Sequence, residues 1–311
     1  MPQTTNSIVM IRPVAFRMNE QTVVNNHYQK VIEGLLPATI NAKAQAEFDA
    51  FVEKLRAVGI NVIVIDDTVE PDTPDSVFPN NWISFHENGD IALYPMFAEN
   101  RRLERREDIF DILEEKGFQI NDIMDYTSAE EDGIFLEGTG NIILDRENEM
   151  AYCALSPRAD EELFIEFCED FEYNPVIFEA YQTVNGERKH IYHTNVMMCI
   201  AETFAVICAD CIDDKAERKM VLQKLKESGK EIILITEDQV NNFAGNMLQV
   251  RGANDERFLI MSNVAFNVLT KEQITKIDKH CKILHASLDI IEACGGGSAR
   301  CMMAEVFLPK K

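Results

Sequence analysis

The sequence has little positive charge for its length. Of its 311 residues, 30 are Lys or Arg and 53 are Asp or Glu, which gives a formal net charge of −23. Proteins that bind nucleic acids or anionic membranes neutralise phosphates with a basic face, so this composition argues against both as partners. The sequence also lacks an apolar run near the ~18 residues that a membrane-spanning helix needs. Its first ten residues do not form the basic start and apolar core of a signal peptide.

Cysteine is scarce and irregularly spaced. Eight Cys in 311 residues lie far below the density of a disulfide-bonded scaffold. We therefore expect reduced thiols and a cytoplasmic location. No tract rich in Pro, Gly or Ser divides the chain, and 46% hydrophobic with 27% charged residues is typical of a globular protein.

An internal repeat organises the chain. Five short segments combine a small or polar pair, usually ending in Asn, with an apolar run, and we call them the anchor segments. Each is named by one residue: Asn81, Asn141, Asn195, Asn246 and Arg300. Successive anchors are 51 to 60 residues apart. This spacing indicates five modules of similar size.

The residues between the anchors repeat as well. Helix-like patterns occupy 42–58, 101–117, 160–172, 214–228 and 271–281. Strand-like runs rich in apolar and β-branched residues follow them at 62–65, 120–126, 176–178, 232–235 and 283–288. A further strand follows four of the anchors, at 91–94, 150–154, 204–208 and 258–261. Each module is therefore predicted to contain a helix between two strands.

The fifth module lacks its last strand, and the start of the chain offers one. Residues 8–16 are similar to residues 259–266, which belong to the fourth module. We therefore predict an α/β fold in which residues 1–311 form a single domain, a five-bladed pseudo-symmetric propeller closed by the N-terminal strand. Such closure protects strand edges that would otherwise be exposed.

In a ring of modules, equivalent loops meet on one face, so the anchor segments are the place to look for chemistry. Cys301 follows a run of three glycines and Arg300, and an adjacent arginine favours the nucleophilic thiolate. A buried structural cysteine is the alternative. His193 occupies an equivalent anchor, although a lone histidine is often structural. Glu137 lies between an apolar pair and a glycine-rich turn, an unusual place for a solvated charge, although a surface carboxylate remains possible.

These segments together resemble a known superfamily. Residues 296–302 resemble the Gly-Gly-Pro-Arg-Cys-Met terminus of arginine deiminases, and residues 135–138 resemble their Leu-Glu-Gly-Gly segment. Residues 193–195 stand in place of His-x-Asp, and residues 78–81 in place of Phe-x-Arg-Asp. In this order, the motifs are similar to those of the guanidine-modifying (pentein) superfamily of arginine deiminases, dimethylarginine dimethylaminohydrolases and amidinotransferases. The resemblance implies a five-bladed α/β propeller.

The resemblance also implies roles for single residues. Cys301 is then the nucleophile, His193 the general acid and base, and Glu137 the carboxylate that orients substrate and histidine. Arg158 and Arg101 resemble a clamp for the carboxylate of an amino-acid substrate, because a guanidinium binds carboxylate bidentately. Arg102 could take the place of Arg101. The resemblance implies no metal or organic cofactor and a small-molecule partner, and it leaves the oligomeric state open.

Two departures bear on the substrate. Asn81 and Asn195 stand where the superfamily has Asp, and a neutral amide suits an uncharged ureido group better than a guanidinium. Residues 16–19 and 25–29 also resemble a citrulline-utilisation branch. The sequence therefore predicts a citrulline ureidase that forms ornithine, ammonia and carbon dioxide. A deiminase, dimethylarginine hydrolase or amidinotransferase acting on a guanidino group is the alternative, followed by a non-catalytic binding protein. Residues 16–40 are expected to form either a lid or a fixed Ω-loop.

Overall fold

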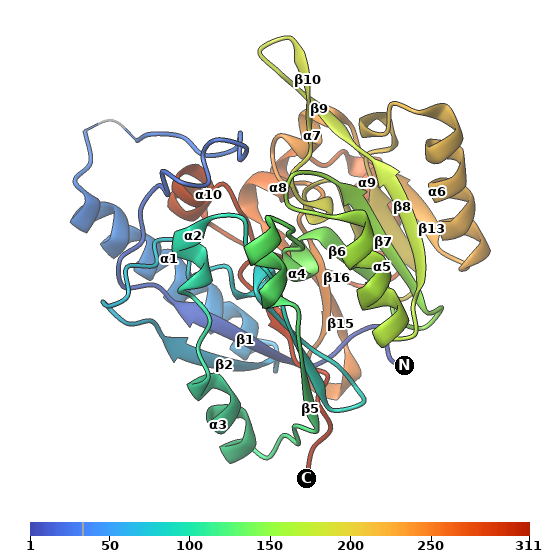
Figure 1. Cartoon of the computed structure of the whole chain (residues 1–311). Helices are drawn as coiled ribbons and strands as arrows, with labels where there is room; N and C mark the ends of the chain where they lie inside the picture. Colours follow the sequence, from blue (N-terminus) through green and yellow to red (C-terminus); the bar gives the residue numbers. More distant parts are fainter. Residues whose placement is uncertain (33) are drawn as a thin grey trace.

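The computed structural model of the chain describes residues 1–32 and 34–311 (Figure 1). The described residues contain five three-stranded sheets with one layout, in which the first two strands pair antiparallel and the last two pair parallel. Their strands are β3 (Ile83–Phe85), β4 (Asp90–Leu93) and β5 (Asp122–Asp125); β6 (Ile142–Asp145), β7 (Met150–Leu155) and β8 (Asn174–Glu179); β11 (Met198–Ile200), β12 (Phe204–Ile207) and β13 (Glu231–Leu234); β14 (Leu248–Arg251), β15 (Arg257–Ser262) and β16 (Lys282–Ala286); and β17 (Ala304–Glu305), β1 (Ser7–Arg12) and β2 (Asn61–Asp66).

Helices carry the chain between the two parallel strands of each sheet, since parallel neighbours need a crossover connection. These helices are α1 (Pro37–Ala57), α2 (Glu99–Arg102) with α3 (Asp108–Glu115), α5 (Glu161–Asp170), α6 (Lys215–Glu227), and α8 (Asn263–Val268) with α9 (Lys271–Ile277). The other helices are α4 (Gly138–Asn141), α7 (Glu237–Val240), α10 (Asp289–Gly295) and the 3₁₀ turns η1 (Pro79–Asn81), η2 (Thr127–Asp132), η3 (Thr194–Val196), η4 (Ala209–Cys211) and η5 (Ala253–Asp255).

The helix predicted over 101–117 is wrong in its extent, because α2 and α3 divide it. Arg101 and Glu104 are both buried and form an ion pair, with Nε 2.8 Å from Oε1. Arg105 then donates to Glu130 and to the carbonyl of Tyr94. These tertiary contacts hold residues 103–107 in a turn, although the local pattern alone favours a helix.

The first helix illustrates how each module builds its core. A proline at the start of α1 suits the first helical turn, where its missing N–H costs nothing. Phe48, Phe51 and Leu55 lie on one face of α1 at helical spacing and are fully buried. They pack in the same apolar cluster as Ile8 and Met10 of β1. The helical period of the sequence therefore fixes which face of α1 covers its sheet.

The start of the chain completes the sheet that follows the last anchor. Ile8 of β1 pairs antiparallel with Glu305 of β17 and parallel with Val62 of β2. The predicted pairing of the N-terminal strand with the fifth module is thus observed. The described residues form a mixed α/β fold of separate sheets, and no single closed sheet joins them. The five-bladed ring itself therefore stays a prediction.

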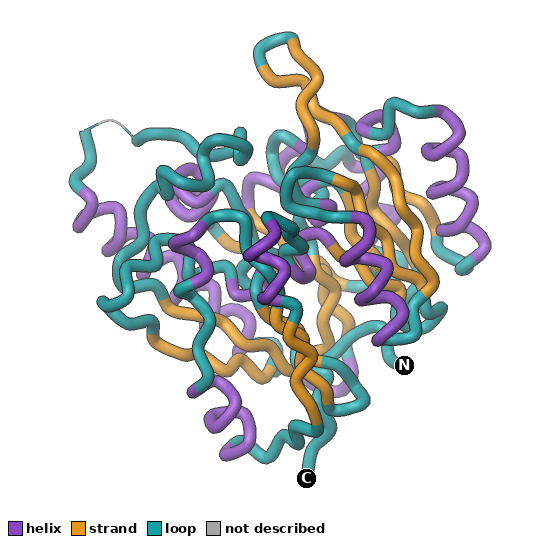
Figure 2. The backbone as a smooth tube through the Cα atoms, viewed as in Figure 1, coloured by secondary structure: helices purple, strands orange, loops and turns teal. Residues whose placement is uncertain are grey.

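Two features have no counterpart in the repeat. A hairpin of β9 (Tyr181–Val184) and β10 (Glu187–His190) projects from the body after β8 (Figure 1). Residues 17–32 form a loop, drawn teal in Figure 2, that lies beside α10. Its hydrogen bonds to α10 include those from Lys30 N to Ala293 O at 2.6 Å and from Asn26 Nδ2 to Gly295 O at 3.2 Å.

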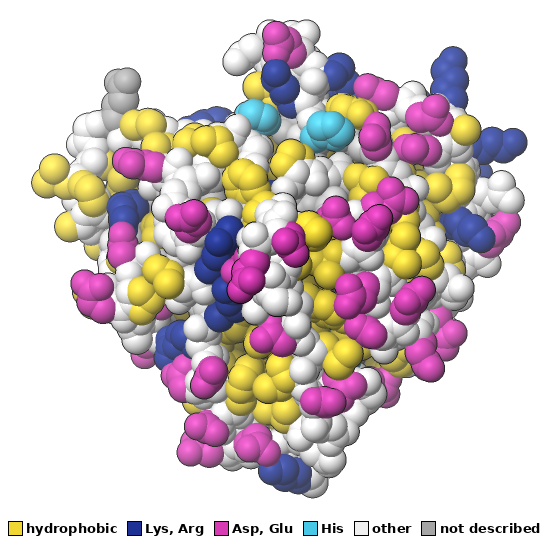
Figure 3. Space-filling model, viewed as in Figure 1, with side chains coloured by type: hydrophobic (Ala, Val, Ile, Leu, Met, Phe, Trp, Pro, Cys, Tyr) yellow, Lys and Arg dark blue, Asp and Glu magenta, His cyan; other side chains and the backbone are white. Residues whose placement is uncertain are grey.

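Acidic side chains are spread over the visible face of the molecule, with basic side chains in smaller groups (Figure 3). The chain has 53 acidic and 30 basic residues. Most of the acidic side chains lie on the solvated surface. Across residues 1–32 and 34–311, none of the helices combines the length and apolar character needed to cross a membrane.

Candidate active site

The five anchor segments contact one another in succession. Gly140 lies so close to Asn81 that a Cβ would be 2.4 Å from its Nδ2, and Asn141 Nδ2 donates to Tyr192 O at 2.9 Å. These contacts join the first anchor to the second and the second to the third. Glycine is required at 140 because any side chain would collide with Asn81 and with His193.

The remaining contacts return to the first anchor. Asn246 Nδ2 donates to Asn195 O at 3.1 Å, and Asn246 Oδ1 accepts from Arg300 N at 3.0 Å. Gly297, just before the fifth anchor, packs on the ring of Phe78, where a Cβ would be 2.8 Å from Cε1. All five anchor residues are buried, so the repeat brings them together at the centre of the molecule.

A small cavity lies where these segments meet. Of the residues singled out in the sequence, Asn81, Arg101, Arg158, His193 and Cys301 line it. Glu137 contacts His193 and Arg158, and Asn195 contacts Cys301. The cavity has a volume of about 10 Å³, which is room for about one water molecule. The structure thus gathers all seven predicted side chains around one space.

Cys301 lies at this cavity with only 3% of its surface exposed. Two amides approach its sulfur: Asn246 Nδ2 at 3.2 Å and Asn195 Nδ2 at 3.6 Å. The sequence suggested that Arg300 would favour the thiolate of Cys301. Its guanidinium instead donates to Met303 O and Glu305 and does not face the thiol. The N–H donors near this sulfur are therefore amide groups and not the neighbouring guanidinium.

His193 and Glu137 form a tight buried pair, with Nε2 2.6 Å from Oε2. Glu137 is fully buried, and its other oxygen accepts from Phe97 N at 3.0 Å. Burial alone would raise the pKa of Glu137, but Arg158 and His193 outweigh it and hold that pKa well below its usual range. Burial lowers the pKa of His193 to about 4, against the opposing effect of Glu137. The pair is therefore a carboxylate and a neutral imidazole at pH 7.

Arg158 is covered by the loop near the start of the chain. We call residues 19–30 the cover segment. The Arg158 guanidinium donates to Glu137 Oε2 at 3.2 Å, to Thr22 O at 3.2 Å, and through Nε to Asn25 Oδ1 at 3.0 Å. Its Nη2 donates to the same Asn25 oxygen, and its charge lies 4.8 Å from the ring centre of Tyr192. The cover segment therefore occupies much of the face that a substrate carboxylate would use.

Arg101, and not Arg102, faces the cavity. Arg101 forms a bidentate pair with Glu104 at 2.8 and 2.9 Å, and its Nη1 donates to Asn81 Oδ1 at 2.9 Å. Arg102 instead donates to Met96 O and lies outside the cavity. The choice that the sequence left open is settled because the single turn of α2 directs the two neighbouring side chains apart.

The contact with Arg101 also fixes the orientation of the Asn81 amide. A guanidinium can only donate, so the atom facing Arg101 is the Asn81 oxygen. Asn81 Nδ2 is then buried without a hydrogen-bond partner among the described residues. An N–H donor therefore remains free on a side chain that lines the cavity.

Sequence reasoning missed two residues at this site. Asp75 lines the cavity at 2% exposure; its Oδ2 accepts from Asn19 Nδ2 at 2.8 Å, while its Oδ1 has no partner among the described residues. Burial raises the pKa of Asp75, against the opposing charge of Arg101. Asn246 is the second, although its place as the fourth anchor was a usable signal. For Asp75 the only signal was an acid within the run that leads to the first anchor.

The described part of the chain contains no group of three or more His, Cys, Asp and Glu side chains arranged to hold a metal ion. All eight cysteines are buried free thiols. The chemistry available at the cavity is therefore that of a thiol, an imidazole paired with a carboxylate, two guanidinium groups and several amides.

Comparison with solved structures gives relatives of the same fold. An arginine dihydrolase, ArgZ, from the ornithine–ammonia cycle in cyanobacteria matches at a TM-score of 0.73 and 17% identity over 98% of this chain. The chain spans 41% of that protein but 99% of its substrate-bound N-terminal domain, where the TM-score is 0.72 at 18% identity. A dimethylarginine dimethylaminohydrolase adduct matches at 0.65 and 16% identity, over 97% of this chain and 99% of that one.

A search of curated proteins gave no match. A family model described as "N,N dimethylarginine dimethylhydrolase, eukaryotic" matches residues 12–308, nearly the whole chain. Taken with the shared fold of the solved relatives, this match shows that the chain belongs to the dimethylarginine dimethylhydrolase family of the guanidine-modifying (pentein) superfamily. The family description and the names of these solved structures are those of hydrolases that act on non-peptide C–N bonds.

Proposed function

We propose that this protein is a cysteine hydrolase that attacks the guanidino carbon of arginine or a closely related amino acid. The observation that carries the proposal is that Cys301 and the His193–Glu137 pair lie at one small cavity. Relatives described as acting on arginine and dimethylarginine support a guanidino substrate. They favour this alternative over the citrulline ureidase that the sequence predicted first.

The charged groups around the cavity fit the two ends of an amino-acid substrate. Arg158 and Arg101 would hold the α-carboxylate, because guanidinium binds carboxylate through paired N–H donors. Asp75 would accept from the α-ammonium through Oδ1, the oxygen left without a partner. A bound cation would also lower the pKa of Asp75, which burial raises. The planar guanidino end then points toward Cys301.

Binding requires the cover segment to move. A cavity of about 10 Å³ cannot hold an amino acid, since it has room for about one water molecule. Asn25 Oδ1 and Thr22 O already occupy Arg158. A substrate carboxylate would take over these donors once the segment opens. We therefore treat residues 19–30 as a lid; Glu33, within the predicted span 16–40, lies outside the described residues.

In the first half-reaction the Cys301 thiol gives its proton to His193, and the thiolate forms a bond to the guanidino carbon. His193 then protonates one nitrogen, which leaves as ammonia while the C–N bond breaks. The product is a covalent intermediate joined through sulfur. Asn246 and Asn195 would stabilise the thiolate with N–H donors at 3.2 and 3.6 Å, and Glu137 would stabilise the transient imidazolium.

In the second half-reaction neutral His193 takes a proton from water, and the hydroxide attacks the same carbon. The C–S bond breaks and the Cys301 thiolate leaves, so that a ureido product remains. One group acting first as acid and then as base is what two-step covalent catalysis requires. The low pKa of His193, about 4, keeps its imidazole neutral and free to accept a proton at neutral pH.

A ureido substrate is the second candidate, and one observation favours it. Asn81 Nδ2 is a buried donor without a partner. It can bond the carbonyl oxygen of a ureido group, whereas a guanidinium offers only donors. The same steps on citrulline would release ammonia and leave a carbamate that decomposes to ornithine and carbon dioxide. An enzyme that performs both reactions in succession would release two ammonia molecules from each arginine.

The test is to incubate purified protein separately with arginine, dimethylarginine, citrulline and agmatine. Ammonia, methylamines, citrulline and ornithine are then measured over time. Citrulline from arginine supports the first proposal, and ornithine from citrulline supports the second. Ornithine and two equivalents of ammonia from arginine support both in succession. Transfer of the amidino group to an added amine would instead identify an amidinotransferase.

Two variants make this test decisive. Cys301→Ala should abolish turnover, while Cys281→Ala, which removes a buried thiol that does not line the cavity, should retain it. Turnover that survives in Cys301→Ala would remove Cys301 from its role. A fully folded wild-type protein that turns over none of the four compounds would contradict the proposed activity and leave a binding role.

We also propose that the five sheets are the blades of one propeller and that residues 1–311 act as a single domain. The succession of anchor contacts, which ends with Gly297 against Phe78, supports this arrangement. A cytoplasmic location is supported by eight free thiols, since disulfides are rare in reducing compartments.

A further inference from the structure

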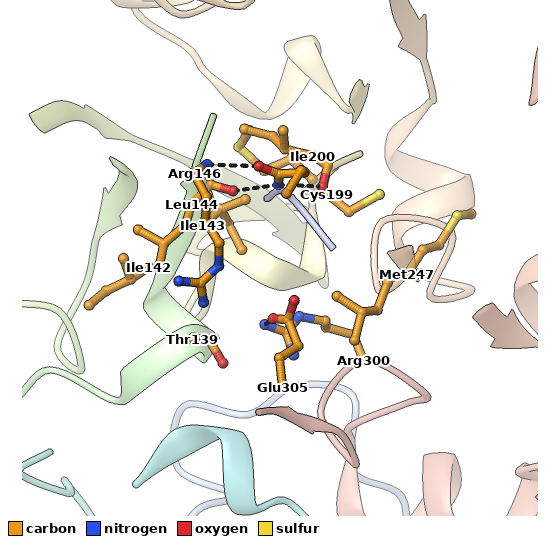
Figure 4. A pocket seen from close by; sticks show the side chains of 13 residues that line it. Thr139, Ile142, Ile143, Leu144, Arg146, Cys199, Ile200, Met247, Arg300 and Glu305 are labelled. Atoms are coloured by element: carbon orange, nitrogen blue, oxygen red, sulfur yellow. Dashed lines mark hydrogen bonds and ion pairs between the residues drawn. The ribbon is translucent and has the colours of Figure 1, made fainter. Parts of the chain in front are cut away.

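A second cavity lies along the strands that follow the anchors, away from Cys301. Its walls come from β6, β11 and β14 together with Gln3, Arg146, Arg300 and Glu305. Figure 4 shows these side chains, with Arg146 and Glu305 directed toward the same space. The volume of about 30 Å³ corresponds to roughly two or three water-sized positions. The cavity that contains Cys301 shares none of these residues.

Arg146 enters this cavity with a buried and unbalanced charge. The residue is 3% exposed, yet none of the described carboxylates lies within 4.0 Å of its guanidinium. Its contacts are a long bond of 3.5 Å to the Tyr173 hydroxyl and the face of the Phe307 ring, 3.9 Å from the ring centre. The neighbouring Asp145 is already paired with Lys230 at 3.0 Å. A buried guanidinium without a counter-charge is costly.

The rest of the cavity does not supply the missing charge. Glu305 is the carboxylate at its wall, and it is paired with Arg300 at 3.0 Å. Arg300 also donates to Met303 O at 2.8 Å. Two guanidinium groups and one carboxylate therefore face one small space, which leaves one positive charge in excess. The neutral Gln3 side chain does not balance this charge, and its amide donates to Leu144 O and Ile200 O.

From this arrangement we propose that a small monovalent inorganic anion, of the size of chloride, binds between Arg146 and Arg300. One such ion neutralises the excess charge and accepts N–H donors from both guanidinium groups. The cavity volume excludes organic anions and disfavours hydrated dianions. Because Arg300 directly precedes Cys301, an ion that fixes the Arg300 side chain also stabilises the turn that carries the nucleophile.

The first test measures thermal unfolding of the intact protein at constant ionic strength while gluconate is replaced by chloride. Gluconate is too large for the cavity and serves as the reference anion. We expect Tm to rise by about 2–5 °C between low and 100 mM chloride, as linkage predicts for an ion that binds the folded state. Bromide and nitrate should act like chloride, and sulfate should have no such effect.

Two variants separate site binding from general salt effects. Arg146→Met keeps the apolar stem and removes the charge, so the chloride dependence of Tm should disappear. Arg12→Met removes an exposed arginine that pairs with Asp49, and it should retain the dependence. A rise in Tm that persists in Arg146→Met, or that all salts produce equally, would overturn the proposal.

A second measurement does not depend on any variant folding well. Crystals of the wild-type protein grown in bromide should show an anomalous peak between the Arg146 and Arg300 guanidinium groups. The finding of water alone at that position, or of no density, would overturn the anion site. Neither measurement uses turnover, so the outcome is independent of the proposed hydrolase activity.

Discussion

Both cavities lie against anchor segments, of which they share only the fifth, and they balance charge in different ways. At the Cys301 cavity each guanidinium has a carboxylate partner: Arg101 pairs with Glu104 and Arg158 with Glu137. At the second cavity Arg300 has Glu305, whereas Arg146 has no carboxylate partner among the described residues. The protein alone therefore pairs every guanidinium of the first cavity with a carboxylate, whereas the second needs an added anion to do so.

This difference indicates which kind of ligand each cavity can bind. A zwitterionic amino acid brings opposite charges to its α-carbon, so a site that holds it needs paired groups that can exchange partners. Arg158 can release Asn25 and accept a carboxylate without leaving Glu137 uncompensated. Arg146 has no protein partner of this kind to exchange. It fits a permanently bound ion better than a substrate that enters and leaves.

The largest expected effect is the difference in the free energy of unfolding between two variants, each of which lacks one arginine at one of the cavities. Arg158→Met leaves Glu137 buried beside a neutral imidazole, and we expect a loss of about 3–5 kcal/mol in the free energy of unfolding. Arg146→Met removes a charge that lacks a partner, so in gluconate it should be neutral or stabilising. Urea unfolding of both variants measures the contrast. Equal losses would show that the two arginines are balanced alike.

The next effect concerns pH and His193. Its folded pKa of about 4 lies below the unfolded value of about 6.5, so the unfolded state binds the proton first as pH falls. Stability should therefore be complete above pH ~6.5 and decline by up to about 3 kcal/mol toward pH ~4. Unfolding curves at several pH values, compared with those of His193→Gln, measure this.

A second buried histidine, His86, gives a control away from Cys301. Burial lowers the pKa of His86, and the Arg146 charge lowers it further. His86→Gln should remove its own share of the acid-side loss, and the double variant should lose less stability between pH ~6.5 and pH ~4 than either single variant. An unchanged pH slope in His193→Gln would contradict the low pKa assigned to His193.

A smaller effect is expected from the amide beside the nucleophile. Asn246→Ala removes the donor 3.2 Å from the Cys301 sulfur, and a hydrogen bond to a charged group contributes roughly 1.5–3 kcal/mol. The rate of Cys301 alkylation by iodoacetamide at neutral pH should fall about ten-fold or more. A merely structural role would lower Tm without changing the pH dependence of alkylation. Asn246→Gln should recover part of the rate if the donor itself matters.

The smallest effect tests the match between Asn81 and the substrate. Asn81→Asp replaces an unpartnered donor with an acceptor, so it should favour a guanidino over a ureido substrate by roughly ten-fold in the ratio of kcat/KM values. Asn88→Asp is a surface control that makes the same chemical change. If Asn81→Asp lowers turnover of both substrates alike, the charge-matching argument fails.

The sequence predicted those parts of the molecule that depend on repetition. The modules, their main strands and the anchor residues follow from patterns that recur at each repeat, and the resemblance of Cys301, His193 and Glu137 to a known set rests on local motifs. Side-chain directions could not be predicted in this way. Arg300 turns from the thiol to Glu305, and Arg101 turns inward while Arg102 does not. Both outcomes depend on partners distant in the fold.

The charge balance of the two cavities could not be predicted from the sequence either. Asp75 and Arg146 are ordinary members of a chain with 53 acidic and 30 basic residues. Their significance comes from burial at 2% and 3% exposure and from which carboxylates and guanidinium groups lie within reach. The helix predicted over 101–117 was divided for a related reason, because the buried Arg101–Glu104 pair overrides local helical preference.

The pairing of β1 with β17 has a consequence for how the protein is made. Thr5 Oγ1 donates to Val306 O across 301 residues of chain, and Cys301 lies just before this junction. Contacts of such long range form late, because the loop they close is entropically costly. During synthesis β1 can pair with β2 early, but its sheet gains its third strand only after β17 has been made. The turn that carries Cys301 therefore reaches its final surroundings late, and a chain that stops before residue 301 carries no nucleophile.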